Sequence, residues 1–342
     1  MEEKSGKKRL WIYLGIAYGV TFLMGLFMWY GRGSEMDLNV FPIAQMMYPA
    51  AGVILGYLVT RKGDRELPRW FFLLFLFLTA GLAGLAVLSV LFPDQLVFLA
   101  GTPVSLWNMA AQYVMLGGSL TGWVLLLAAG KKRRAAYGLG WRNGKVSLLV
   151  ILLFVVLYFA RTAFALALEG KLPLFGILLE TPATWITMAF LPLNFLLCFV
   201  CFFGEEYGWR YYLQPLLQER FGLRGGVLLL GVVWGLWHVP VDFFYYTASV
   251  DMGWAMAAAQ QITCITLGIF FAYAYEKTQN LWVPVLLHFL NNNLVAVVSG
   301  NYSSDVLQNQ TVAWGDLLPA LLVNGLVFGI FLFAKPFKGG KK

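Results

Sequence analysis

Two adjacent acidic residues stand where a long apolar run ends. Glu205 and Glu206 follow closely on the apolar residues 185–203, and Arg210 lies four positions after Glu206. A charged side chain costs at least ~2.5 kcal/mol at the centre of a membrane, so these acids mark a candidate functional site. If the helix continues through them, Glu206 and Arg210 form an i,i+4 pair in the favourable acid-first order. We then expect Glu205, turned about 100° away, to face a cavity. The alternative is an ordinary charged helix end at the membrane surface.

The chain has two histidines, and both lie in later apolar segments. His238 precedes Pro240, which we expect to kink the helix beside it. Asp242, four residues after His238, is a candidate to orient the ring. His288 shares a helix face with Asn292. The alternative to a functional role is that carbonyl groups or hydrogen bonds between helices satisfy these polar side chains. Together with the carboxylates, the histidines favour one constellation of residues over three coincidences.

Membrane helices must position these residues. The chain of 342 residues is 60% hydrophobic and 12% charged, and its mean hydropathy is +0.70, which excludes a water-soluble globule. The apolar runs are continuous for about 20 residues and do not alternate, which indicates helices and not a barrel. We therefore predict an all-α polytopic membrane protein, a bundle of about ten transmembrane helices (roughly 8–10), with the candidate site in the C-terminal half. The predicted spans are 10–30, 41–60, 70–92, 107–129, 146–168, 184–203, 225–246, 255–275, 281–299 and 317–334.

Basic residues predict the orientation of this bundle. The formal net charge is +8, but the lysines and arginines cluster in short loops on alternate sides, which is typical of membrane orientation and not of nucleic-acid binding. The positive-inside rule makes these loops cytoplasmic. We expect an integral multi-pass protein of the plasma membrane, with both termini in the cytoplasm and no nucleic-acid partner. The residues concerned are Lys4, Lys7, Lys8, Arg9, Arg61, Lys62, Arg65, Arg69, Lys131, Lys132, Arg133, Arg134, Arg142, Lys145, Lys335, Lys338, Lys341 and Lys342.

Other unusual residues in the apolar segments have simpler interpretations. Cys198 and Cys201 have C-x-x-C spacing, but we interpret them, with Cys264, as small core residues and not as a redox or zinc pair. Arg161 is either a partner for a carboxylate or a side chain that extends to the outer interface. Glycines recur four apart at 204 and 208 and at 231 and 235, a spacing that lets helices approach closely.

The order of the polar residues resembles a known family. Glu205-Glu206-x-x-x-Arg210 is followed by an aromatic-x-x-x-His motif from Trp234 to His238, and then by His288-x-x-x-Asn292. Each motif lies on a separate apolar segment. The pattern resembles the CPBP intramembrane proteases, the Abi-like type II CAAX prenyl endopeptidase family. The resemblance covers about residues 184–299, and Trp234 stands where the family usually has phenylalanine.

The resemblance implies hydrolysis of a peptide bond by an activated water, without a cofactor. The substrate would be a peptide or membrane protein in the bilayer, processed either at a CAAX-type C-terminus or at another site. In this mechanism a general base activates the water and fixed donors stabilise the oxyanion. The implied roles are general base for Glu205, holding and deprotonating the water for His288, oxyanion donors for His238 and Asn292, and structural support for Glu206 and Arg210.

The resemblance also divides the chain into three parts. Residues 1–183 form N-terminal transmembrane helices without a recognised motif, residues 184–299 form the protease core, and residues 300–342 form an outer loop, a final helix and a basic tail. Three alternatives stay open. Glu205, His238 and His288 could be zinc ligands, although their spacing is not H-E-x-x-H. A transporter could use intramembrane Glu, Arg and His as an ion path. A non-catalytic immunity or partner protein could share the fold.

Overall fold

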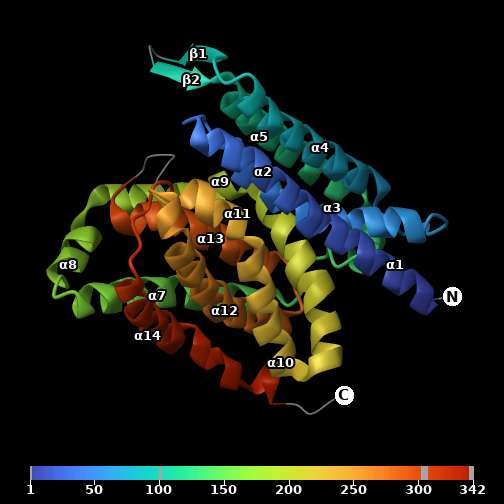
Figure 1. The fold of residues 1–342 in the computed structure, drawn as a ribbon. Coiled ribbons are helices and arrows are strands. Elements are labelled where there is room, and N and C mark those ends of the chain that lie inside the picture. Colours follow the sequence, from blue (N-terminus) through green and yellow to red (C-terminus); the bar gives the residue numbers. More distant parts are fainter. Residues whose placement is uncertain (1, 100–101, 302–306, 339–342) are drawn as a thin grey trace. The chain divides into compact units, whose positions relative to one another are not determined.

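The computed structural model describes residues 2–99, 102–301 and 307–338, so Lys341 and Lys342 of the predicted basic tail lie outside the described residues. The described chain is almost entirely helical, as predicted (Figure 1). It forms two compact units. Unit 1 consists of Met1–Gly140 and Leu196–Tyr212, and unit 2 consists of Trp141–Phe195 and Leu213–Lys342. The three-part division inferred from the motifs stays a prediction.

Unit 1 is built around α3 (Val40–Thr60), which is buried along most of its length and contacts helices on several sides. Apart from the charged first half of α1, its neighbours are predominantly apolar, as a membrane helix requires. They are α1 (Glu2–Leu14), α2 (Thr21–Gly33), α4 (Arg69–Leu91) and α5 (Leu106–Ala128). The π-helix η1 (Gly15–Val20) joins α1 to α2. A short basic helix, α6 (Gly130–Ala136), follows α5. The last part of α9 (Pro182–Glu206) and the π-helix η2 (Tyr207–Leu213) contribute the second chain segment of this unit.

The loop between α4 and α5 forms a small antiparallel sheet, which is the exception to the all-helical prediction among the described residues (Figure 1). β1 (Leu96–Leu99) pairs with β2 (Thr102–Ser105), with Leu96 opposite Ser105. Aliphatic, aromatic and β-branched residues of the type found in strands fill this loop. At its base, the indole N–H of Trp107 donates to the carbonyl oxygen of Phe92 at 2.8 Å.

Unit 2 is built around α12 (Gly253–Thr278), which contacts four of its helices. These are α7 (Gly144–Leu168), α10 (Gln214–Trp237), α13 (Trp282–Ser299) and α14 (Leu317–Val327). α8 (Pro173–Glu180) and the first part of α9 complete the longer helices of the unit. Short helical turns connect them: α11 (Val239–Val241), η3 (Asp242–Tyr246), η4 (Val250–Met252), η5 (Trp314–Asp316), η6 (Gly329–Phe333) and η7 (Lys335–Phe337).

Eight helical segments of the described chain are long and apolar enough to cross a membrane, within the predicted range. One of them, Pro182–Trp237, holds two predicted spans, because the backbone of Gly222 (φ 76°, ψ 165°) interrupts its helix. The last predicted span, 317–334, does not form one long helix. α14 ends at Val327, and Gly329, a residue of low helix propensity, begins the 3₁₀-helix η6.

Candidate functional site

The acidic pair lies at the end of α9, in unit 1. The backbone stays helical beyond Glu206 because η2 continues α9 through Arg210, as the i,i+4 argument required. Glu206 Oε2 and Arg210 Nε lie 2.9 Å apart, and both side chains are completely buried. The predicted ion pair is therefore confirmed. The π-helical geometry of η2 is notable here because π-helical turns occur frequently at functional sites.

Glu205 is also buried, and its partner was not expected from the sequence. The indole N–H of Trp209 donates to Glu205 Oε2 at 3.3 Å. The Trp209 ring meets Tyr13 edge-on, with centroids 6.0 Å apart, and lies 6.3 Å from the ring of Tyr18. The i,i+4 spacing that identified the Glu206 pair also connects Glu205 with Trp209, so this contact could have been predicted. The N-terminal helices thus hold the indole that binds the Glu205 carboxylate.

Two glycines of α9 and η2 bring this segment against the backbone of α3. A Cβ atom on Gly204 would lie 2.3 Å from the carbonyl oxygen of Met46, and one on Gly208 would lie 2.4 Å from Pro49 Cβ. Neither space admits a methyl group. The predicted packing function of this glycine pair is confirmed, and it fixes the segment that carries Glu205 and Glu206.

His238 lies at the C-terminal end of α10 and not in the middle of a helix. α10 ends at Trp237, and the chain continues through α11, which contains Pro240. His238 Nδ1 lies 2.9 Å from the carbonyl oxygen of Trp234 and 3.7 Å from Cys264 Sγ. Nδ1 therefore donates its proton to the carbonyl. In a neutral ring, Nε2 is then an acceptor.

Asp242 does not orient His238, and that prediction was wrong. The carbonyl oxygen of Trp234 accepts the hydrogen bond from His238 Nδ1. Neither carboxylate oxygen of the buried Asp242 has a hydrogen-bond partner among the described residues. The backbone N–H of Asp242 does donate to the carbonyl oxygen of His238 at 2.9 Å. The helical backbone therefore continues from His238 to Asp242, but the ring of His238 binds the preceding turn at Trp234 and not the following one.

Trp234 brings the two histidines together within unit 2. Its ring centroid lies 5.8 Å from that of His238 and 5.6 Å from that of His288. Phe271 on α12 contacts His288 from another element, with centroids 6.0 Å apart. Both imidazoles are buried. The aromatic residue of the second motif therefore lies between the chain's two histidines.

The asparagines of α13 have three different environments. The Asn291 side-chain amide donates to Asn292 Oδ1 at 3.0 Å, while the Tyr158 hydroxyl donates to the backbone carbonyl of Asn291 at 3.3 Å. Asn293 donates to the carbonyl oxygen of Phe289 in its own helix, at 2.9 Å. Asn292 accepts through its carbonyl oxygen, and its NH₂ group is the part of the side chain that can donate to a ligand.

The second glycine pair brings α10 against α12. A Cβ atom on Gly231 would lie 2.7 Å from Ile265 Cα, and one on Gly235 would lie 2.6 Å from the side chain of Gln261. The Gln261 amide donates to the carbonyl oxygen of Gly231 at 3.1 Å. This close approach confirms the second predicted packing pair, and it supports the end of α10 next to His238.

Arg161, a further charged residue inside a predicted span, has structural partners. Arg161 Nε donates to Asn324 Oδ1 at 2.7 Å, and its guanidinium lies 5.6 Å from the ring centroid of Tyr158. Arg161 is thus held by an amide and an aromatic ring, which neither of the two predicted interpretations anticipated. The cysteines are free thiols; Cys201 and Cys264 are buried and Cys198 is half-buried.

The structure therefore brings the predicted site residues together in two sets. Unit 1 holds Glu205, Glu206 and Arg210, and unit 2 holds His238, His288 and Asn292. That these sets act in one site stays a prediction. Among the residues that the structure describes, no three His, Cys, Asp or Glu side chains gather closely enough to hold a metal ion.

Comparison with known proteins identifies the class of the segment that carries these residues. Residues 184–294 match the family described as type II CAAX prenyl endopeptidase Rce1-like. All six predicted site residues lie inside this range. The C-terminal half of the chain therefore contains an Rce1-like domain, and the resemblance to the CPBP family is confirmed for this segment.

Two curated relatives agree with this classification. CAAX prenyl protease 2 of Methanococcus maripaludis is 30% identical over 116 residues, which cover 32% of this chain and 42% of the relative. YdiL of Bacillus subtilis, named as a candidate membrane peptidase, is 24% identical over 100 residues, which cover 28% of this chain and 38% of the relative. The chain thus spans less than half the length of these relatives. No solved structure is significantly similar to the chain.

Proposed function

We propose that this protein is an intramembrane endopeptidase that hydrolyses a peptide bond with water activated by Glu205 and His288. The observation that carries the proposal is the position of Trp234 between the chain's two histidines, inside the Rce1-like segment. Burying polar rings among apolar helices is costly unless they have partners or a ligand. Hydrolysis of a peptide bond gives both imidazoles a function.

Glu205 is the proposed general base. The Trp209 indole binds one of its oxygens and orients the carboxylate, while Arg210 is engaged by the neighbouring Glu206. We assign the role of base to Glu205 because the neighbouring Glu206 already forms the ion pair with Arg210, and a carboxylate can accept a proton from water. His288 would hold the same water molecule and assist its deprotonation.

Asn292 and His238 are the proposed oxyanion donors. Asn292 keeps an NH₂ group for this purpose, since Asn291 binds its carbonyl oxygen. His238 donates its Nδ1–H to the backbone carbonyl oxygen of Trp234, so a second hydrogen bond donated from Nε2 requires a ring that carries both protons.

The test of these roles is peptide hydrolysis by the purified protein in liposomes. Glu205→Gln and His288→Ala should abolish cleavage, whereas Glu219→Gln, which changes an exposed glutamate of α10, should leave it unchanged. Full activity in Glu205→Gln or His288→Ala would refute the mechanism. Activity that is lost after exhaustive removal of metal and restored by zinc would favour the zinc alternative.

A matched pair of asparagine variants tests the oxyanion donor. Asn292→Ala should lower kcat by about 10²–10³-fold, the usual effect of removing one such donor. Asn293→Ala should have little effect, because that amide binds Phe289 in its own helix. If Asn292→Ala keeps its activity, the donor is Asn291 or another residue.

Trp209 is proposed as a positioning residue that acts through Glu205. Trp209→Phe keeps a ring against Tyr13 but removes the N–H that binds the carboxylate. We expect kcat to fall roughly five- to tenfold, the equivalent of about one hydrogen bond, with KM and the melting temperature unchanged. An unchanged kcat, or a lower melting temperature that accounts for the loss, would show that the indole has only a structural role.

The proposed substrate is a membrane-associated peptide, either a CAAX-type C-terminus or another segment near the bilayer. The name of CAAX prenyl protease 2 supports the first class, although the match covers 42% of that relative.

The deciding measurement is proteomic comparison of cells that carry the wild type or Glu205→Gln. Membrane proteins that lose a cleavage product only in the variant are the substrates. A complete lack of differences would favour the non-catalytic partner, and ion flux in liposomes would favour the transporter.

A further inference from the structure

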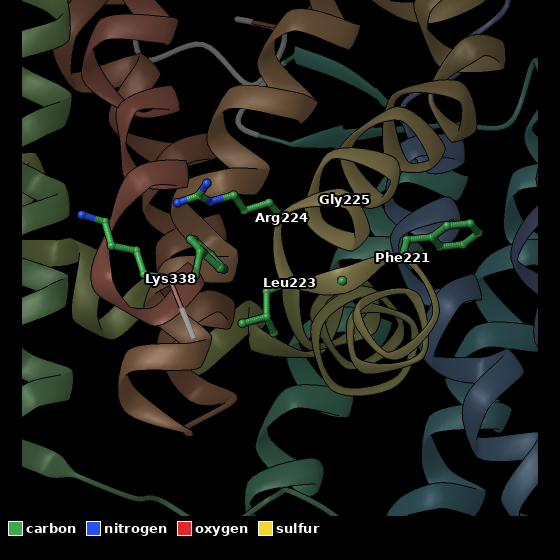
Figure 2. Close-up of a pocket in the computed structure, with 7 residues that line it drawn as sticks. Phe221, Leu223, Arg224, Gly225 and Lys338 are labelled. Carbon is green, nitrogen blue, oxygen red and sulfur yellow. The ribbon is translucent and has the colours of Figure 1, made fainter. Parts of the chain in front are cut away.

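A shallow pocket of about 370 Å³ lies where the C-terminal segment of unit 2 crosses α10 (Figure 2). Its lining includes Arg224, next to the helix interruption at Gly222, and Lys338 from the end of the described chain. In Figure 2 the two basic side chains come from different elements and extend toward the same side, away from Phe221. The pocket thus places two cations beside each other without help from the proposed catalytic residues.

A buried aromatic anchor holds Lys338 in this place. Phe337 packs in an apolar cluster with Val227 of α10 and with Ile269 and Ala272 of α12. All four side chains are almost completely buried. The 3₁₀-helix η7 is therefore fixed across the two helices, and the position of the residue that follows it is a consequence of core packing.

The end of unit 2 that carries the pocket is strongly basic. Two hydrogen bonds join other helix termini at this end of the unit. Asn143, at the beginning of α7, donates to the carbonyl oxygen of Thr278 at the end of α12. Gln214, at the beginning of α10, donates to Glu276 of α12. Acidic residues are few here. The acidic residues of these helix ends and of the C-terminal segment are Glu219 and Glu276. The basic residues are Arg142, Lys145, Arg220, Arg224, Lys277, Lys335 and Lys338.

Neither Arg224 nor Lys338 forms an ion pair with a carboxylate in the described part of the chain, so an anionic ligand would meet two uncompensated charges. The Arg224 guanidinium lies 5.5 Å from the ring centroid of Phe333. Phe333 is 63% exposed, and Phe221 on the other side of the pocket is 51% exposed. A free inorganic anion would use the cations but not the exposed rings. An amphipathic ligand would use both.

We propose that this pocket binds the phosphate headgroup of an anionic phospholipid, with Arg224 and Lys338 at the phosphate and the acyl chains along the exposed aromatic side chains. The predicted topology places this end of unit 2 at the cytoplasmic surface. Basic pockets between transmembrane helices on that side are suited to anionic lipid headgroups. The site is separate from the residues assigned to peptide hydrolysis.

The test is a lipid titration of the purified full chain in detergent, followed by native mass spectrometry. The lipids are dioleoyl phosphatidylglycerol and dioleoyl phosphatidylcholine, which share their acyl chains. Arg224→Ala with Lys338→Ala should weaken phosphatidylglycerol binding about 30-fold, roughly fivefold for each charge near the surface. The control is Lys62→Ala with Lys131→Ala, which removes two exposed charges from other loops of the same predicted side and should leave binding unchanged.

Three outcomes would overturn the proposal. They are equal binding of the two lipids by the wild type, equal weakening by the control pair, and stabilisation by inorganic phosphate alone that disappears in the double variant. If the double alanine variant unfolds, Arg224→Lys with Lys338→Arg keeps both charges and should retain the preference for phosphatidylglycerol. Loss of that preference in a folded charge-preserving variant would also contradict the proposal.

Discussion

Removing the charge of Glu206 should destabilise unit 1 strongly. Glu206→Gln keeps the size of the side chain but removes the negative charge that lies 2.9 Å from Arg210 Nε, and both side chains are completely buried. The attraction that is lost is about 6 kcal/mol at an effective dielectric constant of ~20. Because the remaining charge stays buried, we expect a decrease of about 3–5 kcal/mol in the free energy of unfolding.

The chain offers a control at the same distance. Lys171 Nζ and Glu169 Oε2 also lie 2.9 Å apart, but these side chains are 59% and 57% exposed. Exposed ion pairs contribute about 0–1 kcal/mol, so Glu169→Gln should change stability very little. The comparison therefore varies burial while the distance is constant.

The assay is reversible unfolding in mixed micelles, followed by tryptophan fluorescence, for the wild type and both variants. A double variant, Glu206→Gln with Arg210→Met, completes the cycle and should recover much of the lost stability, since neither charge of the pair stays buried. A loss of less than about 1 kcal/mol in Glu206→Gln, or an equal loss in Glu169→Gln, would refute the reasoning.

Two further predictions concern packing and pH. Gly204→Ala should destabilise the protein by about 1–3 kcal/mol, because its Cβ would meet the backbone oxygen of Met46 at 2.3 Å, whereas Gly81→Ala, with open space around it, should stabilise α4 by up to about 1 kcal/mol. Equal melting temperatures for the two variants would contradict this. The Tyr137 hydroxyl donates to Asp64 at 2.6 Å and lowers the pKa of that carboxyl group. This contribution to stability is complete above the ordinary pKa of about 4 and is lost as the pH falls through the lower folded-state value. Tyr137→Phe should remove part of the acid dependence of the melting temperature between about pH 5 and 2, and identical curves would exclude this contribution.

The features that sequence predicts well here are those decided within one segment. Apolar length determines a membrane helix, so the predicted span 107–129 corresponds to Leu106–Ala128 in the structure. The Glu206–Arg210 pair was predictable because both residues lie on one helical segment, four positions apart. The hairpin β1–β2 was missed because only its pairing distinguishes a short apolar strand from a loop.

The features that sequence did not predict depend on which helices are neighbours. Arg161 binds Asn324, which is 163 positions later, and no local pattern connects the two. The ring of His238 had two potential partners one turn away, Trp234 before it and Asp242 after it. The structure selects Trp234, and the helix end beside Pro240 could be expected from the sequence whereas this choice of partner could not.

The close contact of Gly204 and Gly208 with α3 affects how sequence variation among relatives should be interpreted. A larger residue at either position would displace the segment that bears Glu205 and Glu206, although neither glycine contributes a reactive group. Two kinds of invariance are therefore expected in this stretch, one chemical and one steric. A relative that has lost the acids but keeps both glycines would retain the helix contact without the chemistry. Glycine at these positions is thus expected to mark the architecture, and the acids are expected to mark the proposed activity.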